Sequence, residues 1–275
     1  PDAILALIRD AAKSVKPDAP IIGEVWEDAV TKESYGSRRN YALGYSLDSV
    51  MNYPLRSAVL SFMHGWSDAY ALRDFLISQQ MNYPKPLYYS LMNLLGSHDV
   101  DRLRTALAAD RNLRELSRED QLKYEFSEGA LSRALQQERL CAAIQFAIPG
   151  VPSIYYGDEQ GMCGVCDPFN RLPFKEGERE LHDWYAQLAN MRNSADAFST
   201  GHAQFMAATG DVLLILRWIS DGHDAFGDAA ENGAYLAVIN RGAAEVHYRA
   251  DCSAAGCGTV EGTAEPVSAK IIRIT

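Results

Sequence analysis

The chain has 275 residues, of which 47% are hydrophobic, and a formal net charge of −10 at pH 7. A chain of this length can bury a sizeable core and is expected to form one large domain, or a large and a small one. The acidic charge argues against nucleic acid and anionic membrane surfaces as partners. No apolar run approaches the ~20 residues that span a bilayer, so no membrane contact is expected. Five thinly spread cysteines do not suggest a disulfide framework, which favours a reducing, cytoplasmic location.

Helix-type and strand-type segments alternate through the first part of the chain. Apolar residues recur at helical spacing in residues 1–16, where Pro1 suits a first helical position and Pro17 ends the helix. Short apolar runs predict buried strands at residues 20–26, 48–53, 91–97 and 152–156. Further helices are predicted at residues 54–64, 68–81, 132–147 and 178–193. Residues 31–47 are expected to form a loop, and 106–131 an excursion with one or two short helices.

The sequence changes character after about residue 197. Short alternating runs, separated by Gly, Asp and Asn, predict an antiparallel β domain. Its expected strands are residues 204–208, 212–220, 234–240, 245–249 and 269–275, with a weak strand pair at best over 250–266. We therefore expect one unit over residues 1–197 and a second over 198–275. Four βα units are half of an eight-stranded barrel; a small doubly wound sheet is the alternative, although no glycine-rich nucleotide loop follows any strand.

Ionisable residues gather after the predicted strand 91–97, where His98, Asp99, Asp101 and Arg102 arrive together. In a parallel α/β barrel the carboxyl ends of the strands carry the chemistry, because the following loops open toward the substrate there. This pattern is typical of an active site. A solvated loop, in which Asp99 or Asp101 caps a helix, is the alternative that this stretch alone leaves open.

A second candidate, Glu24, lies near the end of the predicted strand 20–26. Glycoside hydrolysis needs two opposed carboxyl groups, one of which is protonated so that it can give a proton to the leaving oxygen. Val25 and Trp26 flank Glu24, and apolar surroundings favour the neutral form of a carboxyl group. Trp26 can also stack on a sugar ring. The alternative is a structural ion pair of Glu24 with Arg38 or Arg39.

Four motifs follow one another in the chain: GEVWEDA at 23–29, LGSHDVDR at 95–102, GVPSIYYGDEQG at 150–161 and DPFNRLPF at 167–174. In this order and spacing they resemble the α-amylase superfamily, glycoside hydrolase family 13, and within it the neopullulanase and cyclomaltodextrinase branch. The resemblance covers residues 1 to about 197. It implies an α/β fold, the C-terminal half of a (β/α)8 TIM barrel, followed by an all-β antiparallel sandwich domain that the rest of the chain fits.

Carried over to the matching positions, the resemblance implies that Glu24 is the general acid/base. It implies that Asp99 holds sugar hydroxyls and stabilises the oxocarbenium-like transition state, with His98 as a hydrogen-bond donor beside it. The substrate-binding residues that the resemblance implies are Trp26 on the leaving-group side and Asp167 and Arg171 on the opposite side.

The activity implied by the resemblance is retaining cleavage of α-glucosidic bonds in malto-oligosaccharides, pullulan or cyclodextrins. The expected partner is thus an α-glucan oligosaccharide. No metal site and no cofactor are expected in this chain. Whether a preceding half of the barrel binds calcium is left open. A catalytically inactive sugar-binding or interaction protein of the same fold is the alternative.

One feature of the family has no match in this sequence. The family's nucleophile is an aspartate on the fourth barrel strand in an Arg-x-Asp context, and by the family's spacing it would precede Pro1. Asp28 and Asp48 are the nearby acids considered for this role, and neither has that context. We therefore expect a C-terminal half that is inactive alone. Its open sheet edges predict self-association, most plausibly as a dimer that buries the edge of strand 20–26.

The pair Cys163 and Cys166 has the spacing of a zinc or redox site. A structural zinc ion needs four ligands, and the other nearby pair, Cys252 and Cys257, belongs to the second predicted domain. We therefore predict that Cys163 and Cys166 serve packing or form an incidental disulfide, rather than binding a metal or carrying out redox chemistry.

Overall fold

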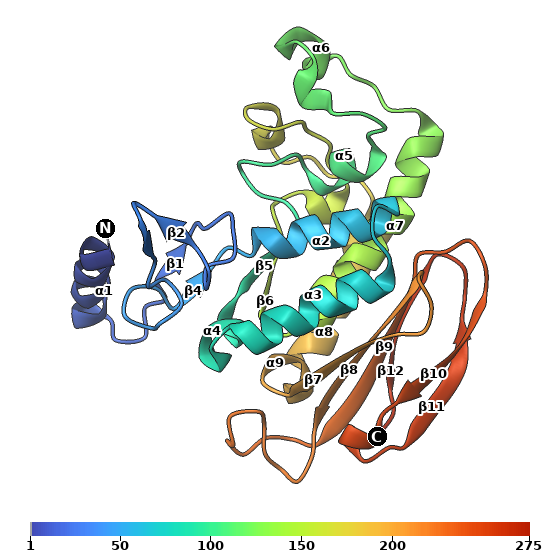
Figure 1. Cartoon of the computed structure of the whole chain (residues 1–275). Helices are drawn as coiled ribbons and strands as arrows, with labels where there is room; N and C mark the ends of the chain where they lie inside the picture. The colour runs from blue at the N-terminus through green and yellow to red at the C-terminus, as the bar shows by residue number, and fades with distance from the viewer. Residues whose placement is uncertain (1) are drawn as a thin grey trace.

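The computed structural model describes residues 2–275 and divides them between a helix-rich part and a C-terminal β part (Figure 1). The first element of the described residues is α1 (Asp2–Val15), as the apolar spacing predicted, and the helical position predicted for Pro1 lies outside them. No helix within residues 2–275 combines the length and the apolar character that crossing a membrane requires.

The framework of the first part is a set of short parallel strands, β1 (Ile22–Gly23), β4 (Ser49–Val50), β5 (Met92–Leu94) and β6 (Val151–Ser153). β1 pairs with β4 and β5 with β6, and a parallel bridge between Met51 and Met92 joins the two pairs. The spatial order therefore equals the chain order. That is the winding of a barrel, whereas a doubly wound sheet reverses its strand order part way. The fold class predicted from the sequence is confirmed.

All four strands are shorter than predicted. An apolar run marks residues that become buried, and burial extends beyond the hydrogen-bonded ladder. Val25 is 6% exposed although β1 ends two residues earlier. At the other edge the chain leaves β6 after Ser153, and the amide of Asp158 then donates to the carbonyl of Tyr155 to close a turn.

Helices cover this framework, and their ends follow local capping signals. α2 (Tyr53–His64) starts at Asn52, whose side chain accepts the amide of Leu55, and stops at Gly65, which has a left-handed φ of 75°. α3 (Ala69–Asn82) also agrees with its prediction, while α7 (Glu128–Ala147) begins four residues early because Ser127 caps it. The longer helices are completed by α8 (Arg179–Asn193).

Several short elements fill the connections. α4 (Lys85–Ser90) and α5 (Leu103–Ala108) were not predicted, because six residues are too few to show a helical period. The hairpin of β2 (Glu33–Ser34) and β3 (Ser37–Arg38) lies in the predicted loop 31–47. The remaining short helices are η1 (Leu113–Glu115), α6 (Arg118–Leu122), η2 (Asp158–Gln160), η3 (Phe169–Arg171) and α9 (Asp196–Ser199).

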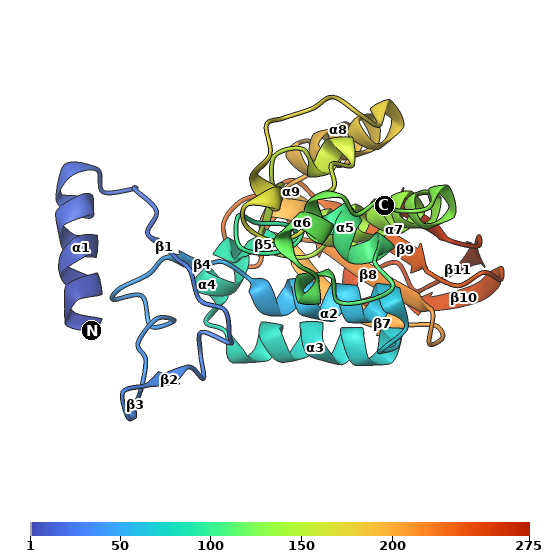
Figure 2. The ribbon, with the colours of Figure 1, turned by 90° about the horizontal axis from the view of Figure 1, so that it is seen from above.

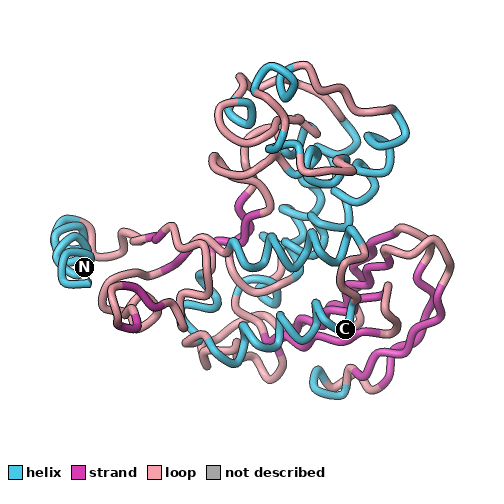
Figure 3. Tube along the Cα trace, turned by 45° about the horizontal axis from the view of Figure 1, so that its top comes forward, coloured by secondary structure: helices cyan, strands magenta, loops and turns pink. Residues whose placement is uncertain are grey.

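The C-terminal part is an antiparallel sandwich, and most strand residues in Figure 3 belong to it. Its larger sheet has the order β12-β9-β8-β7, formed by β7 (His202–Ala207), β8 (Val212–Ile219), β9 (Gly233–Asn240) and β12 (Ser268–Arg273). The smaller sheet is a hairpin of β10 (Val246–Asp251) and β11 (Thr259–Ala264), paired over six residues of each strand and stronger than the weak pair expected there. Its η4 turn spans Ser253–Ala255.

The larger sheet is buried on both faces, and this joins the two parts of the chain. Along β8, Leu213 and Ile215 pack against the helices, while Val212 and Leu214 pack against the β10–β11 hairpin. This alternation is the period of two expected of a strand between two apolar layers. The core is therefore continuous from α2, α3 and α7 into the sandwich.

The N-terminal helix is the exception to this packing. Figures 1 and 2 show α1 at one end of the molecule, away from the main body. None of its residues is buried. Polar contacts hold it: Arg9 and Lys13 lie 2.8 and 3.0 Å from the carboxylate of Asp48. Its apolar residues Ile4, Leu7, Ile8 and Val15 face solvent.

A buried contact between Arg104 and Glu138 fixes α7 against α5. Arg104 Nε lies 2.6 Å from Glu138 Oε2, and both side chains are almost completely buried. Burial raises the pKa of Glu138 to about 8, despite the opposing effect of Arg104. The neutral form of this carboxyl group is therefore favoured in the fold far more than in the unfolded chain.

We predict that this proton makes stability depend on pH. Between pH 4.5 and about 8 the folded protein retains a proton on Glu138 that the unfolded chain has lost, so stability falls as pH rises. Relative to Glu138→Gln, the wild type should lose free energy of unfolding between pH 5 and 8, on the order of 1 kcal/mol per pH unit. Urea unfolding at both pH values measures this. Glu119→Gln, at an exposed ion pair, is the control and should keep the wild-type slope; an equal slope in Glu138→Gln would contradict the prediction.

Candidate active site

Polar side chains follow three of the parallel strands shortly after each strand ends. Glu24 comes directly after β1, Tyr53 follows β4, and Ser97, His98 and Asp99 follow β5. Because the strands are parallel, these ends lie at one edge of the sheet. The structure thus brings Glu24 and Asp99 together at one edge, as expected from the sequence.

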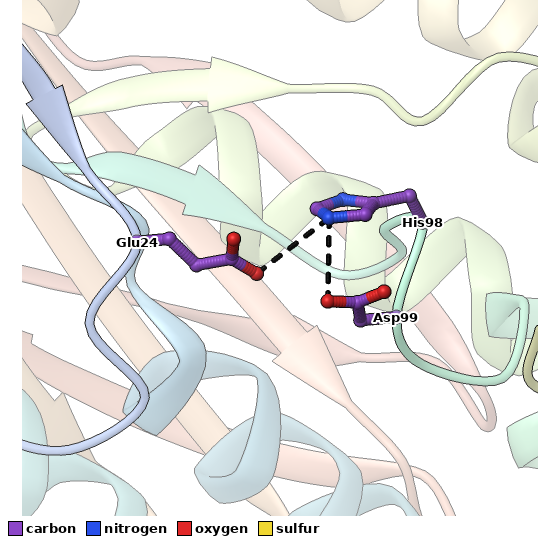
Figure 4. A group of neighbouring side chains, drawn as sticks. All are labelled: Glu24, His98 and Asp99. Carbon is purple, nitrogen blue, oxygen red and sulfur yellow. Dashed lines mark ion pairs between the residues drawn. The ribbon is translucent and has the colours of Figure 1, made fainter.

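His98 lies between the two carboxylates, as Figure 4 shows. Its Nε2 atom is 3.7 Å from Glu24 Oε1 and 3.3 Å from Asp99 Oδ2. The side chains of Glu24, His98 and Asp99 are 38%, 44% and 36% exposed, so a ligand can reach all three. The cluster therefore presents two carboxylates and an imidazole to solvent from two different strands.

Arg171 extends this cluster across the loop after β6. Its Nη2 atom lies 2.9 Å from Asp99 Oδ1, and its Nε atom lies 3.1 Å from Asp167 Oδ1. Arg171 Nε also donates to the carbonyl of His98. Five of the six predicted site residues, Glu24, His98, Asp99, Asp167 and Arg171, thus form one continuous chain of charged and polar contacts.

The sixth predicted residue, Trp26, stacks on Tyr53. Their ring centroids are 4.1 Å apart and the rings are 6° from parallel, and Trp26 is 47% exposed. The contacts recorded for Glu24 are polar: Tyr53 Oη donates to Glu24 Oε1 at 3.1 Å, and His98 lies on its other side. The sequence suggested an apolar wall beside Glu24; in the structure Trp26 stacks on Tyr53, and polar groups contact Glu24.

Tyr53 was missed by the sequence analysis as a site residue. Burial, together with the carboxylate of Glu24, raises the pKa of Tyr53 to about 12, so its hydroxyl remains a hydrogen-bond donor. Its hydroxyl also lies 3.0 Å from Ser97 Oγ, which in turn accepts the amide of Asp99. Its position as the last residue of the predicted strand 48–53 was the available signal, since the ends of the strands carry the site.

Asn170 is the second residue that the sequence did not mark. Its side chain is fully buried, and Nδ2 donates to the carbonyls of Ser97, His98 and Val100 at 3.1, 2.8 and 2.8 Å. One amide thereby fixes the backbone that carries His98 and Asp99. An asparagine inside a polar loop has no local feature that reveals such a role.

Other charged residues after the strands have structural contacts. Arg102 is fully buried, 3.5 Å from Asp158 and within cation–π distance of Tyr155 and Tyr156. Burial raises the pKa of Asp158 to about 7. Gly96 lies directly over this carboxylate, where a Cβ atom would be 2.2 Å from Asp158 Oδ2. This buried pair thus packs directly against the backbone at Gly96, two residues before His98.

The alternative partners for Glu24 are engaged elsewhere. Arg39 pairs with Asp2 at 2.7 Å, and Arg38 donates to the carbonyl of Val30. Asp28 and Asp48, the acids that the sequence analysis considered, also have partners other than Glu24: Asp28 accepts the amide of Val30, and Asp48 binds α1. The structure therefore does not show the alternative ion pair of Glu24 with Arg38 or Arg39.

The cluster also has the donor set of a metal site. One atom from each of Glu24, His98 and Asp99 lies within 4.8 Å of the others. Imidazole and carboxylate groups suit several divalent metals. However, Arg171 already neutralises Asp99, and Tyr53 donates to Glu24. We therefore interpret the cluster as a site for a polar organic substrate.

Cys163 and Cys166 have free thiols that are partly buried. Burial raises the pKa of Cys163, which makes it a poor nucleophile and metal ligand. Backbone contacts hold the segment between them: the amide of Gly164 donates to Thr105 Oγ1 and that of Cys166 to Asp101 Oδ1. These contacts agree with the packing role predicted for the pair.

Comparison with known proteins provides the family of this chain. The model of the alpha-amylase catalytic domain matches residues 3–200. The amylopullulanase of Thermoanaerobacter thermohydrosulfuricus is 36% identical over 253 residues, which are 86% of this chain and 16% of that protein. The cyclomaltodextrinase of Geobacillus thermopakistaniensis is 32% identical over 239 residues, which are 85% of this chain and 33% of that protein.

A solved structure agrees with the fold. The cyclic α-maltosyl-(1→6)-maltose hydrolase of Arthrobacter globiformis, in complex with cyclic α-maltosyl-(1→6)-maltose, superposes with a TM-score of 0.75 at 24% identity. The match covers 99% of this chain and 53% of that one. The present chain thus spans about half of that structure and a third or less of the two curated relatives.

Proposed function

The chain belongs to the α-amylase family, glycoside hydrolase family 13, in its neopullulanase and cyclomaltodextrinase branch, and we propose that it carries the acid/base side of a retaining α-glucan hydrolase. The proposed substrates are malto-oligosaccharides, pullulan and cyclodextrins; the names of the similar enzymes refer to pullulan and to cyclomaltodextrins. One observation supports the proposal most strongly: the side chains of Glu24, His98 and Asp99 contact one another at the carboxyl ends of two parallel strands, and all three are partly exposed.

Glu24 is proposed as the general acid/base. In the first step its carboxyl proton passes to the glycosidic oxygen as the bond to the sugar breaks; in the second it takes a proton from the attacking water. Its environment suits both steps, because the Tyr53 hydroxyl orients one oxygen while the side chain stays 38% exposed. Trp26 stacks on Tyr53, whose hydroxyl binds Glu24, and the indole ring is exposed enough for a leaving sugar to stack on it.

Asp99 and His98 are proposed to hold the sugar at the bond that breaks. A carboxylate fixed near the ring stabilises the positive charge that develops on the oxocarbenium-like transition state. Arg171 and His98 flank Asp99 and hold its orientation, which supports an electrostatic role. Asp167 and Arg171 extend the polar surface to a neighbouring sugar unit.

Retaining chemistry needs a nucleophilic carboxylate ~5–5.5 Å from the acid. Asp99 is near enough to Glu24, but it is already bound to Arg171 and His98, and its position matches the family's sugar-binding aspartate. We propose that the nucleophile comes from the other half of the barrel. Two facts support this: the chain spans about half of a solved relative, and within residues 2–275 β1 and β6 each pair on one side only.

The first test replaces Glu24 in a protein that joins this sequence to a complete barrel. Glu24→Gln removes the proton donor without changing the shape of the side chain, so pullulan and maltotriose cleavage should fall about 10²–10⁴-fold. Glu27→Gln is the matched control: it lies on the same loop, is 59% exposed and pairs with Lys32. Reducing-sugar assays measure both variants. Cleavage that survives Glu24→Gln would show that the acid is elsewhere.

The second test concerns residues 1–275 alone. Ile22 and Val151, on the two outer strands, are about half exposed, and such open edges favour pairing with another chain. We predict a dimer by light scattering and no turnover of p-nitrophenyl maltoside, with activity restored on adding the other barrel half. A monomer that hydrolyses this substrate on its own would contradict the division of the site.

A further inference from the structure

A second feature of the fold has the chemistry of a sugar site: an exposed tryptophan beside a polar cavity, outside the catalytic cluster. Trp66 follows the C-terminal end of α2 and is 76% exposed. The cavity is lined by residues of α2, of α5 and of the segment that follows α5. The helices α2 and α5 are neighbours in the fold (Figure 1). The volume of the cavity is about 570 Å³, within the ~300–1,000 Å³ usual for small-molecule sites.

The indole is held with one face covered and one face open. His64 stacks on it, with ring centroids 4.4 Å apart and an angle of 18° between the rings. The Nε2 atom of His64 lies 3.0 Å from the carbonyl of Ala106, and burial lowers the pKa of His64, so the ring is neutral and donates through Nε2. The backing ring is thereby fixed from α5.

The backbone on both sides of Trp66 is also fixed. Gly65 adopts a left-handed φ of 75°, which turns the chain off the helix axis, and the amide of Trp66 donates to the carbonyl of Ser61. On the other side Arg241, from the end of β9, donates to the carbonyl of Ser67 at 2.6 Å. An exposed aromatic ring that is held in this way loses little conformational entropy when a ligand stacks on it.

The rest of the cavity offers hydrogen-bonding groups of both signs. Asp110 and Arg111 line it with side chains that are 77% and 62% exposed, and Asn112 lies next to them. Arg56 and Asp101 also line the cavity, and Arg56 donates to the Asp101 carbonyl. Paired donors and acceptors beside one aromatic face suit a neutral polyhydroxylated ring better than an ion or a purely apolar ligand.

We propose that Trp66 and this cavity form a second binding site for an α-glucan chain. The glucose ring would stack on the open face of Trp66, and its hydroxyls would bond to Asp110 and Arg111. Binding here would keep a long substrate near the catalytic cluster and raise its effective concentration there. The ligand class rests on the proposed function, whereas the existence of the site rests on the geometry of Trp66.

The test is isothermal titration of residues 1–275 with maltoheptaose. Trp66→Ala should weaken binding about tenfold, because it removes the stacking face, and Trp66→Phe should restore part of the loss. Tyr45→Ala is the matched control, since Tyr45 is also a loop aromatic and is 71% exposed. Circular dichroism of each variant checks that the fold is kept.

Measuring binding and cleavage separately distinguishes the proposed second site from the proposed function. Wild-type affinity in Trp66→Ala would overturn the second site even if Glu24→Gln abolishes cleavage. Trp66-dependent binding of maltoheptaose would support the site even if Glu24→Gln leaves cleavage intact, a result that defeats only the proposed function. Equal, Trp66-dependent binding of cellohexaose would overturn the assignment to α-glucans.

Discussion

Parallel strands bring their carboxyl ends to one edge of a sheet, and the positions of the site residues follow from that constraint. Glu24 and Asp99 are 75 residues apart in the chain but follow β1 and β5, which run in the same direction. The ladders themselves are only two or three residues long. The loops beyond them are therefore positioned by side chains rather than by the sheet.

Two sets of contacts carry out that positioning. The buried amide of Asn170 donates to the carbonyls of Ser97, His98 and Val100 in the loop after β5. Arg102 and Asp158 form a buried pair, and Gly96 lies so close to Asp158 that there is no space for a Cβ atom. A buried ion pair is weak evidence for stability, because desolvation offsets the attraction. Here its main consequence is geometric, since it fixes the backbone two residues before His98.

The sequence predicted those features that depend on local signals. The limits of α2 could be predicted because Pro54 and Gly65 mark its ends, and the grouping of Glu24 with His98 and Asp99 because motifs and strand ends coincide. The lengths of the strands could not be predicted, since an apolar run reports burial rather than pairing. α5 was too short to show a period.

The site features that the sequence did not predict depend on contacts between segments that are distant in the chain. Nothing near Asn170 in the sequence indicates that its amide reaches the loop after β5, about 70 residues away. Likewise, the stacking of Trp26 on Tyr53 joins the loop after β1 to the first residue of α2, and this contact depends on the pairing of β1 with β4. Such residues are identified only once the strand order is known.

The central claim, that Glu24 is the proton donor rather than a positioning residue, is tested most directly by the leaving group. Fluoride leaves a sugar without protonation, whereas a glucose unit of maltotriose must be protonated as it leaves. In a complete barrel carrying Glu24→Gln, kcat/KM for maltotriose should fall about 10²–10⁴-fold, while that for fluoride release from α-maltosyl fluoride should change less than about tenfold. An equal loss on both substrates would contradict the assignment of Glu24 as the acid.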